Sequence, residues 1–580
     1  NGTGSSCELF FTTHFEVQPT YLAIVNCGEA HHAMIRTASG CQQLEMLNYD
    51  TSGLLYDVQA GKDFRHPLEY PLECVLPMHA CIEKCLELLP YYKIDTLDLT
   101  VIEKAIEGMQ VGIAIERYVV HQVMRPHTPS IRSFDLFDTL LGRMHYRPDS
   151  IYELVEKLYP FPGFSFFRVV AECKSDHTLP GIYQELQKLI ELSEEEAVKL
   201  MQFEFETELA HIFPIVENID LVKEGDLIVS DTYYSTEQIK QLLERLQLSK
   251  KVHIYASPQG KSSGTAWAFL KNNYRIESHL GDSLHSDVTM AKLQKIAANH
   301  YTNGQLSSEE QALLQKGQRD LSYLCRALRL SNPYEPNSGE WHLWNDQCRL
   351  NVPILIHASL FLHAFCQTHK KRRILFTSRD GCIWIQVFRQ MFPQYDSIYF
   401  QSSRHVYMHA SPSYVEYVRS LYTDDTVITD AQGKGTSCEH FFKMHLQIDP
   451  TYLAIINCGV AQHGIMRVET GCEQIEMLNY DTCGTLYDMQ NGEALRRELE
   501  YPTWVVPPMH ACIKKCVELL PFYNIDVFDQ AVVESAVQAM RSGIALNQYL
   551  LHAYWHSESY HDFIKSIQQV KNSLFFGSMK

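Results

Sequence analysis

The sequence has too little positive charge to balance its negative charge. It contains 50 lysine and arginine residues and 69 aspartate and glutamate residues, so its formal net charge is −19. An acidic surface repels the phosphates of nucleic acids and of anionic membranes. We therefore expect no nucleic-acid partner and no general affinity for a membrane surface, although local basic pockets are compatible with this charge.

Long apolar runs are also scarce. The longest, within Pro353–Cys366, is too short to cross a bilayer and carries two histidines. We expect it to form a buried helix, and we expect no transmembrane segment. The sequence does not open with the charged and apolar parts of a signal peptide. Its 17 cysteines are odd in number and widely spread, which favours reduced thiols in a cytoplasmic protein.

Two parts of the chain are near copies of one another. The stretch Pro19–Gly28 reads "PTYLAIVNCG", and Pro450–Gly459 reads "PTYLAIINCG". Cys81 and Cys512 stand in a second matching pair of stretches, and the offset of 431 residues (512 minus 81) also relates Pro19 to Pro450. A constant offset without gaps indicates that one module is duplicated, rather than a short-period repeat.

The second copy is fuller than the first. It is preceded by "RRILFTSRDG" (Arg372–Gly381) and by "TVITDAQGKGTSCEHFF" (Thr426–Phe442), which predict a buried strand and a strand, Gly-rich turn and helix. The first copy opens with "NGTGSS", inside the equivalent turn. We therefore expect the sequence to be a fragment of a longer protein. A homo-oligomer partner is another option for completing the core of the first copy.

Residues 131–325, between the copies, have unrelated sequence in which strand-like runs alternate with helical ones. This alternation predicts a doubly wound parallel sheet. We predict an α/β protein whose central domain is flanked by the duplicated α/β modules, a partial one at 1–130 and a fuller one at 326–580. The helical region at about 147–215 is predicted to form a cap on the central domain.

Four motifs stand at predicted strand ends of the central domain, where functional groups of such sheets collect. They supply Asp135, Ser230, Lys261 and the pair Asp282 and Asp287. A carboxylate can attack phosphorus and form an acyl-phosphate, while a hydroxyl and an ammonium group hold the phosphoryl oxygens and other carboxylates hold Mg²⁺. Asp135 and Asp282 can instead be ordinary turn residues at strand ends, where aspartate is common, which accounts for either aspartate alone but poorly for the ordered set.

At these residues the sequence resembles the haloacid dehalogenase superfamily, whose members are mostly phosphatases. The resemblance implies a helical cap over the site and Mg²⁺ as the cofactor. The roles that it implies are nucleophile for Asp135, phosphate ligands for Ser230 and Lys261, and Mg²⁺ ligands for Asp135, the Phe137 carbonyl, Asp282 and Asp287.

One position departs from the pattern of this superfamily. Most of its phosphatases have an aspartate two residues after the nucleophile as general acid and base, and this chain has Phe137 there, with Asp138 one residue further on. A slip of one residue points a side chain elsewhere, so Asp138 can instead cap the following helix. Three interpretations stay open. Asp138, His285 or Tyr233 supplies the proton, the leaving group needs little protonation, or the domain is an inactive scaffold or effector that binds ligands.

The second module has a Gly-rich turn between a predicted strand and a helix. The strand ends at Asp430, Gly433 and Gly435 allow tight backbone turns, and Thr436 and Ser437 precede the helix. Backbone N–H groups at such a helix start can cradle phosphate. The turn resembles the diphosphate-sugar loop of phosphoribosyltransferases, which implies phosphoribosyl diphosphate as a ligand. That family usually has two adjacent acids after the strand, where this sequence has one.

Two arginines at other predicted strand ends, Arg379 and Arg404, also suit phosphate, because a guanidinium forms paired hydrogen bonds with it. An ordinary Gly-rich turn with surface arginines accounts for these residues equally well.

Two repeated motifs have weaker meanings. In "PMHACIEKC", a zinc site through His79, Cys81 and Cys85 is disfavoured, because no second Cys/His pair lies nearby, and we expect buried cysteines on a helix. The doubled "EMLNYD" can hold the hydroxyls of a sugar or form turns. Its polar residues are Glu45, Asn48, Asp50, Glu476, Asn479 and Asp481.

The order of these parts resembles multidomain proteins of bacterial surface-polysaccharide loci, in particular the phosphatase and ribofuranosyl-transfer portion of capsule polymerases. The resemblance implies that a phosphoribosyl donor delivers a phosphorylated ribose to a growing chain and that the phosphatase then removes the phosphate. A sugar phosphate or phosphorylated oligosaccharide would be the substrate. The location implied is cytoplasmic, with peripheral association at the inner membrane as an option.

Overall fold

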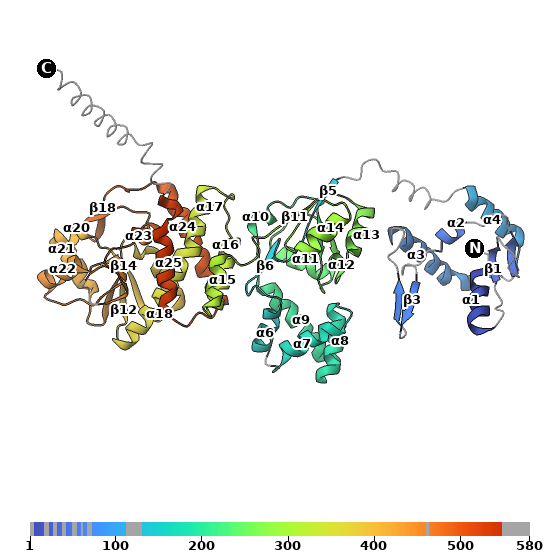
Figure 1. Ribbon diagram of the computed structural model, residues 1–580, viewed down its shortest axis with the longest axis horizontal. Helices are drawn as coiled ribbons and strands as arrows, with labels where there is room; N and C mark the ends of the chain where they lie inside the picture. Colours follow the sequence, from blue (N-terminus) through green and yellow to red (C-terminus); the bar gives the residue numbers. More distant parts are fainter. Residues whose placement is uncertain are drawn as a thin grey trace, which may run out of the picture. The chain divides into compact units, whose positions relative to one another are not determined.

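The computed structural model has a mixed α/β architecture with several parallel sheets, which confirms the predicted fold class (Figure 1). The chain divides into two compact units near Ser130. The structure describes residues 5–16, 22–26, 32–36, 42–48, 55–59, 62–65, 72–94, 96–111, 130–159, 161–459 and 463–547. The glycines of the first copy's turn and Asp50 lie outside these ranges.

The first unit contains a two-stranded parallel sheet, an antiparallel hairpin and helices. Its elements are α1 (Ser5–Phe15), β1 (Leu22–Asn26), β2 (His32–Arg36), α2 (Gln42–Met46), β3 (Leu55–Gln59), β4 (Lys62–Arg65), α3 (Leu72–Leu88), η1 (Leu89–Tyr91) and α4 (Leu99–Val111).

The same elements recur 431 residues later in the second copy. For example, Leu22 pairs with His32 between β1 and β2, and Leu453 pairs with His463 between the corresponding strands. The recurring elements are α22 (Thr436–Leu446), β15 (Tyr452–Asn457), β16 (His463–Arg467), α23 (Glu473–Leu478), β17 (Leu486–Gln490), β18 (Glu493–Arg496), η4 (Thr503–Val505), α24 (Val506–Leu519), η5 (Leu520–Phe522) and α25 (Gln530–Ser542).

The two copies differ in how much of this structure is buried. Ile24 of β1 is 48% exposed, whereas Ile455 of β15 is fully buried. Cys81 and Cys85 of α3 are exposed, contrary to the prediction of buried cysteines, whereas Cys512 and Cys516 of α24 are buried. The reason is that helices which precede α22 in the chain cover α24, and the described part of the first unit contains no counterparts of those helices.

The central domain is built on a five-stranded sheet in the order β11-β10-β5-β8-β9. β10 pairs with β11, β5 with β8 and β8 with β9, all in parallel. All four residues of β8, "LIVS", are buried, as expected for a parallel strand covered on both faces. The elements are β5 (Ser130–Phe134), β8 (Leu227–Ser230), α11 (Thr236–Arg245), β9 (His253–Ala256), α12 (Gly260–Ser263), α13 (Thr265–Asn273), β10 (Arg275–Gly281), the π-helical turn η2 (Leu284–Thr289), α14 (Met290–Leu293) and β11 (Ala298–His300).

A helical insertion interrupts the central domain after its first strand. The antiparallel strands β6 (Leu141–Arg143) and β7 (Ile212–Pro214) form its base, and α10 (Val216–Ile219) follows. Between these strands, α6 (Asp149–Leu158), α7 (Phe164–Lys174), α8 (Leu179–Ile190) and α9 (Glu194–Ala210) pack on one another (Figure 1). The start of α9 is fixed by a capping box in which Ser193 and Glu196 satisfy each other's backbone N–H groups.

A set of helices joins the central domain to the second copy. They are α15 (Ser308–Gln315), α16 (Arg319–Leu330), α17 (Gly339–Asp346), the π-helical turn η3 (Gln347–Asn351) and α18 (Val352–Thr368). One apolar core contains Met144 and Phe213 of the central domain together with α16, α18 and α24. The domain boundary predicted between residues 325 and 326 falls inside α16.

One continuous helical stretch, Gly339–Thr368, is long and apolar enough to span a membrane, and 78% of its most apolar segment is buried within the protein. It includes Pro353–Cys366, which the sequence predicts to be a buried helix, and α18 buries most of its residues.

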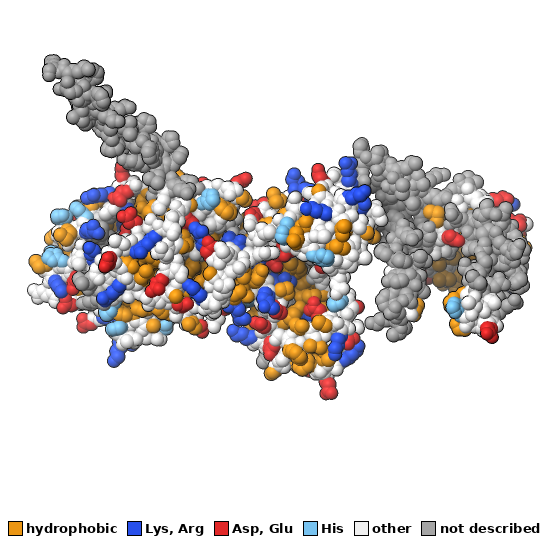
Figure 2. Space-filling model, viewed as in Figure 1, with side chains coloured by type: hydrophobic (Ala, Val, Ile, Leu, Met, Phe, Trp, Pro, Cys, Tyr) orange, Lys and Arg blue, Asp and Glu red, His pale blue; other side chains and the backbone are white. Residues whose placement is uncertain are grey.

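The second copy completes a five-stranded parallel sheet in the order β13-β12-β14-β15-β16. The remaining elements are β12 (Arg373–Thr377), α19 (Gly381–Met391), β13 (Asp396–Phe400), α20 (Arg404–Met408), α21 (Pro412–Leu421) and β14 (Thr426–Gly433). On the face shown in Figure 2, basic and acidic side chains of the described residues are interspersed.

Candidate active site

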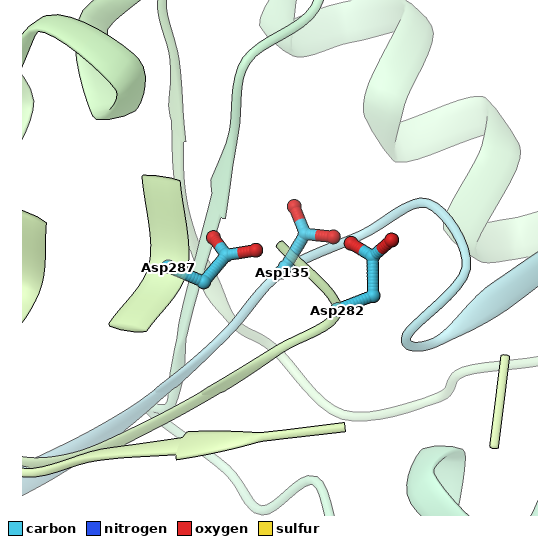
Figure 3. Close-up of side chains that lie close together, drawn as sticks. All are labelled: Asp135, Asp282 and Asp287. Atoms are coloured by element: carbon cyan, nitrogen blue, oxygen red, sulfur yellow. The ribbon is translucent and has the colours of Figure 1, made fainter. Parts of the chain in front are cut away.

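Three aspartates from the predicted motifs come together at the carboxyl ends of neighbouring strands. Asp135 directly follows β5, Asp282 follows β10, and Asp287 lies in the π-helical turn η2. One carboxylate oxygen from each lies within 4.8 Å of the other two. Their carboxyl groups point to the same side, with that of Asp135 in the middle (Figure 3).

Lys261 is the cation of this cluster. Its ammonium group donates to Asp135 and, at 2.6 Å, to Asp287, and its side chain is only 4% exposed. The hydroxyl of Thr139 donates to the second oxygen of Asp135 at 3.2 Å. The nucleophile candidate is therefore held by two donors, one charged and one neutral.

Lys261 can balance only one of the three carboxylates, so the cluster would carry net negative charge if all three were ionised. Burial raises the pKa of Asp135 well above its ordinary value, although the Lys261 charge opposes this. Burial and the neighbouring carboxylates of Asp138 and Asp287 raise the pKa of Asp282 to about 6. Burial also acts to raise the pKa of Asp287, but hydrogen bonds and charge from His279 and Lys261 lower it below its ordinary value. Without a further cation, these effects favour the ionised form of Asp287 more than those of Asp135 and Asp282.

Asp287 is held by groups that sequence reasoning missed. His279, a fully buried residue of β10, contacts Asp287 through Nε2 at 3.2 Å and Ser133 through Nδ1 at 2.9 Å. The backbone N–H of Ser283 donates to the other oxygen of Asp287 at 2.9 Å. A Cβ on Gly281 would lie 2.3 Å from the Asp287 carboxyl carbon, so glycine is required for this close approach. His279 gave no sequence signal because it belongs to none of the four motifs and lies in a strand of mixed polar and apolar residues.

Ser230 and Lys261 come from adjacent strands. Ser230 is the last residue of β8 and is buried, and Lys261 lies in α12, after β9. The Asp231 carboxylate accepts hydrogen bonds from the backbone N–H groups of Lys261 at 2.6 Å and of Ser262 at 2.9 Å. Asp231 therefore fixes the short helix that presents the Lys261 ammonium group to the aspartates.

Phe137 lies against charged groups at the base of the insertion. The Arg143 guanidinium lies 4.0 Å from the centroid of its ring and donates to the Glu208 carboxylate at 2.7 Å. Burial opposes the charge of Arg143, but Glu208 keeps its pKa raised. The position two residues after Asp135 is thus occupied by an aromatic ring with no proton to give.

The three predicted proton donors are placed differently. Asp138 forms an ion pair with Arg326 of α16, at 2.6 Å. Burial and nearby carboxylates raise the pKa of Tyr233 to about 12, and its hydroxyl oxygen accepts a hydrogen bond from Tyr152. His285 contacts the backbone carbonyl of Ser262 at 3.1 Å, in the helix that carries Lys261.

The helical insertion contacts the loop before this helix, because His177 of the insertion contacts the side chain of Gln259 at 2.9 Å.

A second site lies in the C-terminal module, as a cavity of about 840 Å³. Sequence reasoning predicted six of the residues that line it, namely Asp430, Gly433, Gly435, Thr436, Ser437 and Arg404. The cavity lies beyond the carboxyl ends of β12 and β14, where the strand order of the sheet reverses. Ligands of open α/β sheets bind at such a switch point.

Of the residues that the sequence predicted to bind phosphate in this module, Arg379 is not among those that line the cavity. Its guanidinium lies 5.6 Å from the ring centroid of Tyr501 and 3.7 Å from the Glu500 carboxylate. The next residue, Asp380, does line the cavity, and burial raises its pKa well above the ordinary value, with Asp430 adding to the effect. Burial also raises the pKa of Asp430 to about 6, against hydrogen bonds from Tyr452 and Thr377.

The residues of the second "EMLNYD" separate into two groups. Glu476 lines the cavity and accepts a hydrogen bond from Gln432 at 2.9 Å. Asn479 is fully buried and exchanges hydrogen bonds with Asn351 of η3, and Asp481 accepts from Tyr399. In the first copy, Asn48 donates to the carbonyl of Leu44 at 2.7 Å, as a turn-forming residue does.

Comparisons with known proteins add little to this geometry. No family model matches the chain, and no curated protein matches it. Among solved structures, the chain is similar to a haloacid dehalogenase-like family hydrolase from Xanthomonas campestris, with 13% identity over 30% of this chain and 82% of that one and a TM-score of 0.22. A likeness at this identity and TM-score assigns neither fold nor activity, so the function is argued from the site.

Proposed function

We propose that the central domain is a Mg²⁺-dependent phosphomonoesterase of the haloacid dehalogenase type that acts on a sugar phosphate. The observation that carries this proposal is the buried cluster of Asp135, Asp282 and Asp287 with Lys261 at the carboxyl edge of a parallel sheet. Perturbed pKa values of buried groups in such a cluster are typical of catalytic sites.

The roles follow from the positions of the side chains. Asp135 attacks phosphorus and forms an aspartyl-phosphate, which water then hydrolyses. Lys261 neutralises charge on the phosphoryl oxygens, and Ser230 at the next strand end supplies a hydroxyl to them. Thr139 keeps the Asp135 carboxylate oriented through its 3.2 Å hydrogen bond.

The cluster fits a hard divalent cation. Carboxylate oxygens are the ligands that Mg²⁺ prefers, and three carboxylates with one ammonium group leave net negative charge in a buried place. Asp135, Asp282 and Asp287, with the Phe137 carbonyl, would hold Mg²⁺. When bound, the ion offsets the repulsion between the nucleophile and the phosphate.

We assign a second activity, phosphoribosyl or ribofuranosyl transfer, to the C-terminal module. The cavity of about 840 Å³ supports it, because a Gly-rich turn, a helix start and Arg404 all line it, and binding of phosphoribosyl diphosphate would use such groups. In capsular polysaccharide synthesis, the two activities would transfer a phosphorylated ribose and then expose its hydroxyl. A cytoplasmic protein, peripheral at the inner membrane and assembled as a homo-oligomer, suits this role.

Release of inorganic phosphate from ribose 5-phosphate and from phosphorylated oligosaccharides tests the proposal. Release is expected with Mg²⁺ and is expected to stop with EDTA or in the Asp135→Asn variant. Asp149→Asn is the matched control, because Asp149 lies on the insertion and pairs with Arg147 in solvent. Phosphate release by Asp135→Asn at the parent rate would refute the assignment of the nucleophile. If the parent protein releases no phosphate and binds no beryllium fluoride with Mg²⁺, the alternative of an inactive binding scaffold is correct.

A further inference from the structure

We propose that Arg326 is a positioning residue for the catalytic turn and that it acts through Asp138. Arg326 lies on α16, outside the sheet that carries Asp135, and is 1% exposed. The reaction that the turn serves rests on the proposed function, while the contact between the two residues does not. This role explains why the chain keeps an aspartate at a place where it cannot act as the usual proton donor.

The Arg326 guanidinium binds both ends of the segment that follows the nucleophile. Nη2 donates to the Asp138 carboxylate at 2.6 Å, and Nη1 donates to the Arg143 carbonyl at 3.3 Å. Nε donates to the Gly304 carbonyl at 2.7 Å, and the guanidinium lies 4.5 Å from the Tyr146 ring centroid. One buried cation therefore connects the start and the end of the turn from Asp138 to Arg143.

The turn has a conformation that requires support. Asp138 has φ +54, a left-handed conformation that residues other than glycine rarely adopt. Its N–H donates to the Leu141 carbonyl at 2.7 Å, and its own carbonyl lies so close to Gly304 that a Cβ there would be 2.1 Å away. Such conformations persist where the surroundings hold the residue on several sides. Arg326 supplies the side-chain contact among these restraints.

The position of the turn matters because Asp135 and Phe137 lie immediately before it in the chain. Both a nucleophile and a metal-ligating carbonyl need placement to within a fraction of an ångström, and small displacements lower rates strongly. α16 belongs to the apolar core shared with the C-terminal module. The catalytic turn is therefore held in place by a residue from that shared core.

Arg329, one turn further along α16, offers a matched control. It pairs with Glu310 at 2.7 Å and donates to the carbonyls of Asn303 and Gln305, which flank Gly304. Arg329 thus supports the same neighbouring loop, but it makes neither of the hydrogen bonds that Arg326 donates to Asp138 and Arg143. A purely structural role for arginines on α16 would make the two arginines equivalent.

The test uses the full chain with Arg326→Gln, Asp138→Asn, the double variant and Arg329→Gln. With p-nitrophenyl phosphate and Mg²⁺, Arg326→Gln and Asp138→Asn are expected to lower kcat at least tenfold with KM within twofold of the parent. The double variant is expected to be no slower than the slower single variant, because each single substitution already removes the contact between Arg326 and Asp138. Arg329→Gln is expected to keep the parent kcat while lowering the thermal midpoint.

Amide hydrogen exchange of residues 135–141 tests the positioning without turnover. Exchange at Asp138, Leu140 and Leu141 is expected to quicken at least tenfold in Arg326→Gln and to stay unchanged in Arg329→Gln. Parent-like exchange and kcat in Arg326→Gln, or equal effects of both arginine variants, would overturn the inference. If Arg326→Gln does not fold, Asp138→Asn decides by the same measurements. Absence of phosphatase activity in the parent refutes the proposed function alone, and the exchange result still decides the inference.

Discussion

The Arg143 guanidinium lies 4.0 Å from the centroid of the Phe137 ring, at the position two residues after Asp135. Arg143 is held there by Glu208 at 2.7 Å, so a buried ion pair backs the aromatic ring. The position at which most haloacid dehalogenase phosphatases have a carboxylic acid is therefore occupied here by an aromatic ring next to a buried cation. Under the proposed function, this arrangement would determine which phosphate esters the site can cleave.

The first prediction concerns the leaving group. Without a positioned acid, rates are expected to fall steeply as the pKa of the leaving alcohol rises, so p-nitrophenyl phosphate should be hydrolysed much faster than alkyl phosphates. Phe137→Asp should raise the rate on alkyl phosphates by about tenfold or more, because general acid catalysis contributes roughly 10²- to 10⁴-fold. Phe137→Leu is the control and should not. A parent rate independent of the leaving group would contradict this prediction.

The second prediction concerns Lys261, whose side chain is 4% exposed. Lys261→Met leaves Asp135 and Asp287 without their cation and is expected to lower the free energy of unfolding by about 3–5 kcal/mol. Phosphate release should be lost. Mg²⁺ should restore part of the stability in thermal unfolding, because it neutralises the same carboxylates. An unchanged thermal midpoint in the absence of Mg²⁺ would show that the ion pair does not hold this cluster together.

The third prediction is a pH dependence of stability. The folded-state pKa of Asp430, about 6, lies above its ordinary value of 3.8, so folding favours the protonated carboxyl group. Its contribution is fully present below pH 4 and is lost as the pH rises through 6. Relative to Asp430→Asn, the parent should lose on the order of 2–3 kcal/mol of unfolding free energy between pH 4 and pH 7. Denaturant unfolding at several pH values measures this, and parallel curves would contradict it.

The fourth prediction concerns Gly435, which has φ +68. A Cβ at this position would lie 2.7 Å from the Tyr452 ring, and Tyr452 donates to Asp430 at 2.9 Å. Gly435→Ala is expected to cost about 1–3 kcal/mol of stability and to weaken binding of phosphoribosyl diphosphate, as measured by calorimetry. Gly492→Ala is the control, since Gly492 also has positive φ but has open space around it. Equal losses of binding in both variants would refute the assignment of the cavity.

Local sequence patterns were enough to place some parts of this structure. The parallel sheets follow from alternating strand and helix runs, and strand ends brought Asp135, Asp282 and Asp287 together as a doubly wound sheet requires. The 431-residue offset between the repeated sequences also relates their helices and strands, because similar local sequences form similar elements. The burial of equivalent residues is not the same in the two copies. Cys81 and Cys512 have matching sequence neighbours, but Cys81 is exposed and Cys512 is buried.

The remaining features depend on contacts between residues far apart in sequence. Arg326 is 188 residues from Asp138, so no motif could have connected them. His279 lies in a strand of mixed polar and apolar residues, "RIESHLG", in which no local pattern indicates its contact with Asp287. Arg379 was expected to line the phosphate cavity from its strand end, but its side chain packs toward Tyr501, because the direction of a side chain after a strand depends on the loop that follows.

The placement of α16 has an evolutionary consequence. A helix that completes the apolar core of one module and also holds the catalytic turn of another cannot be cut without harming both. Recombination between chains that contain such modules should therefore exchange the central domain together with the module that follows it. In related chains, breakpoints are expected outside the segment from Arg319 to Leu330, and an arginine aligned with Arg326 should be inherited together with an aspartate aligned with Asp138.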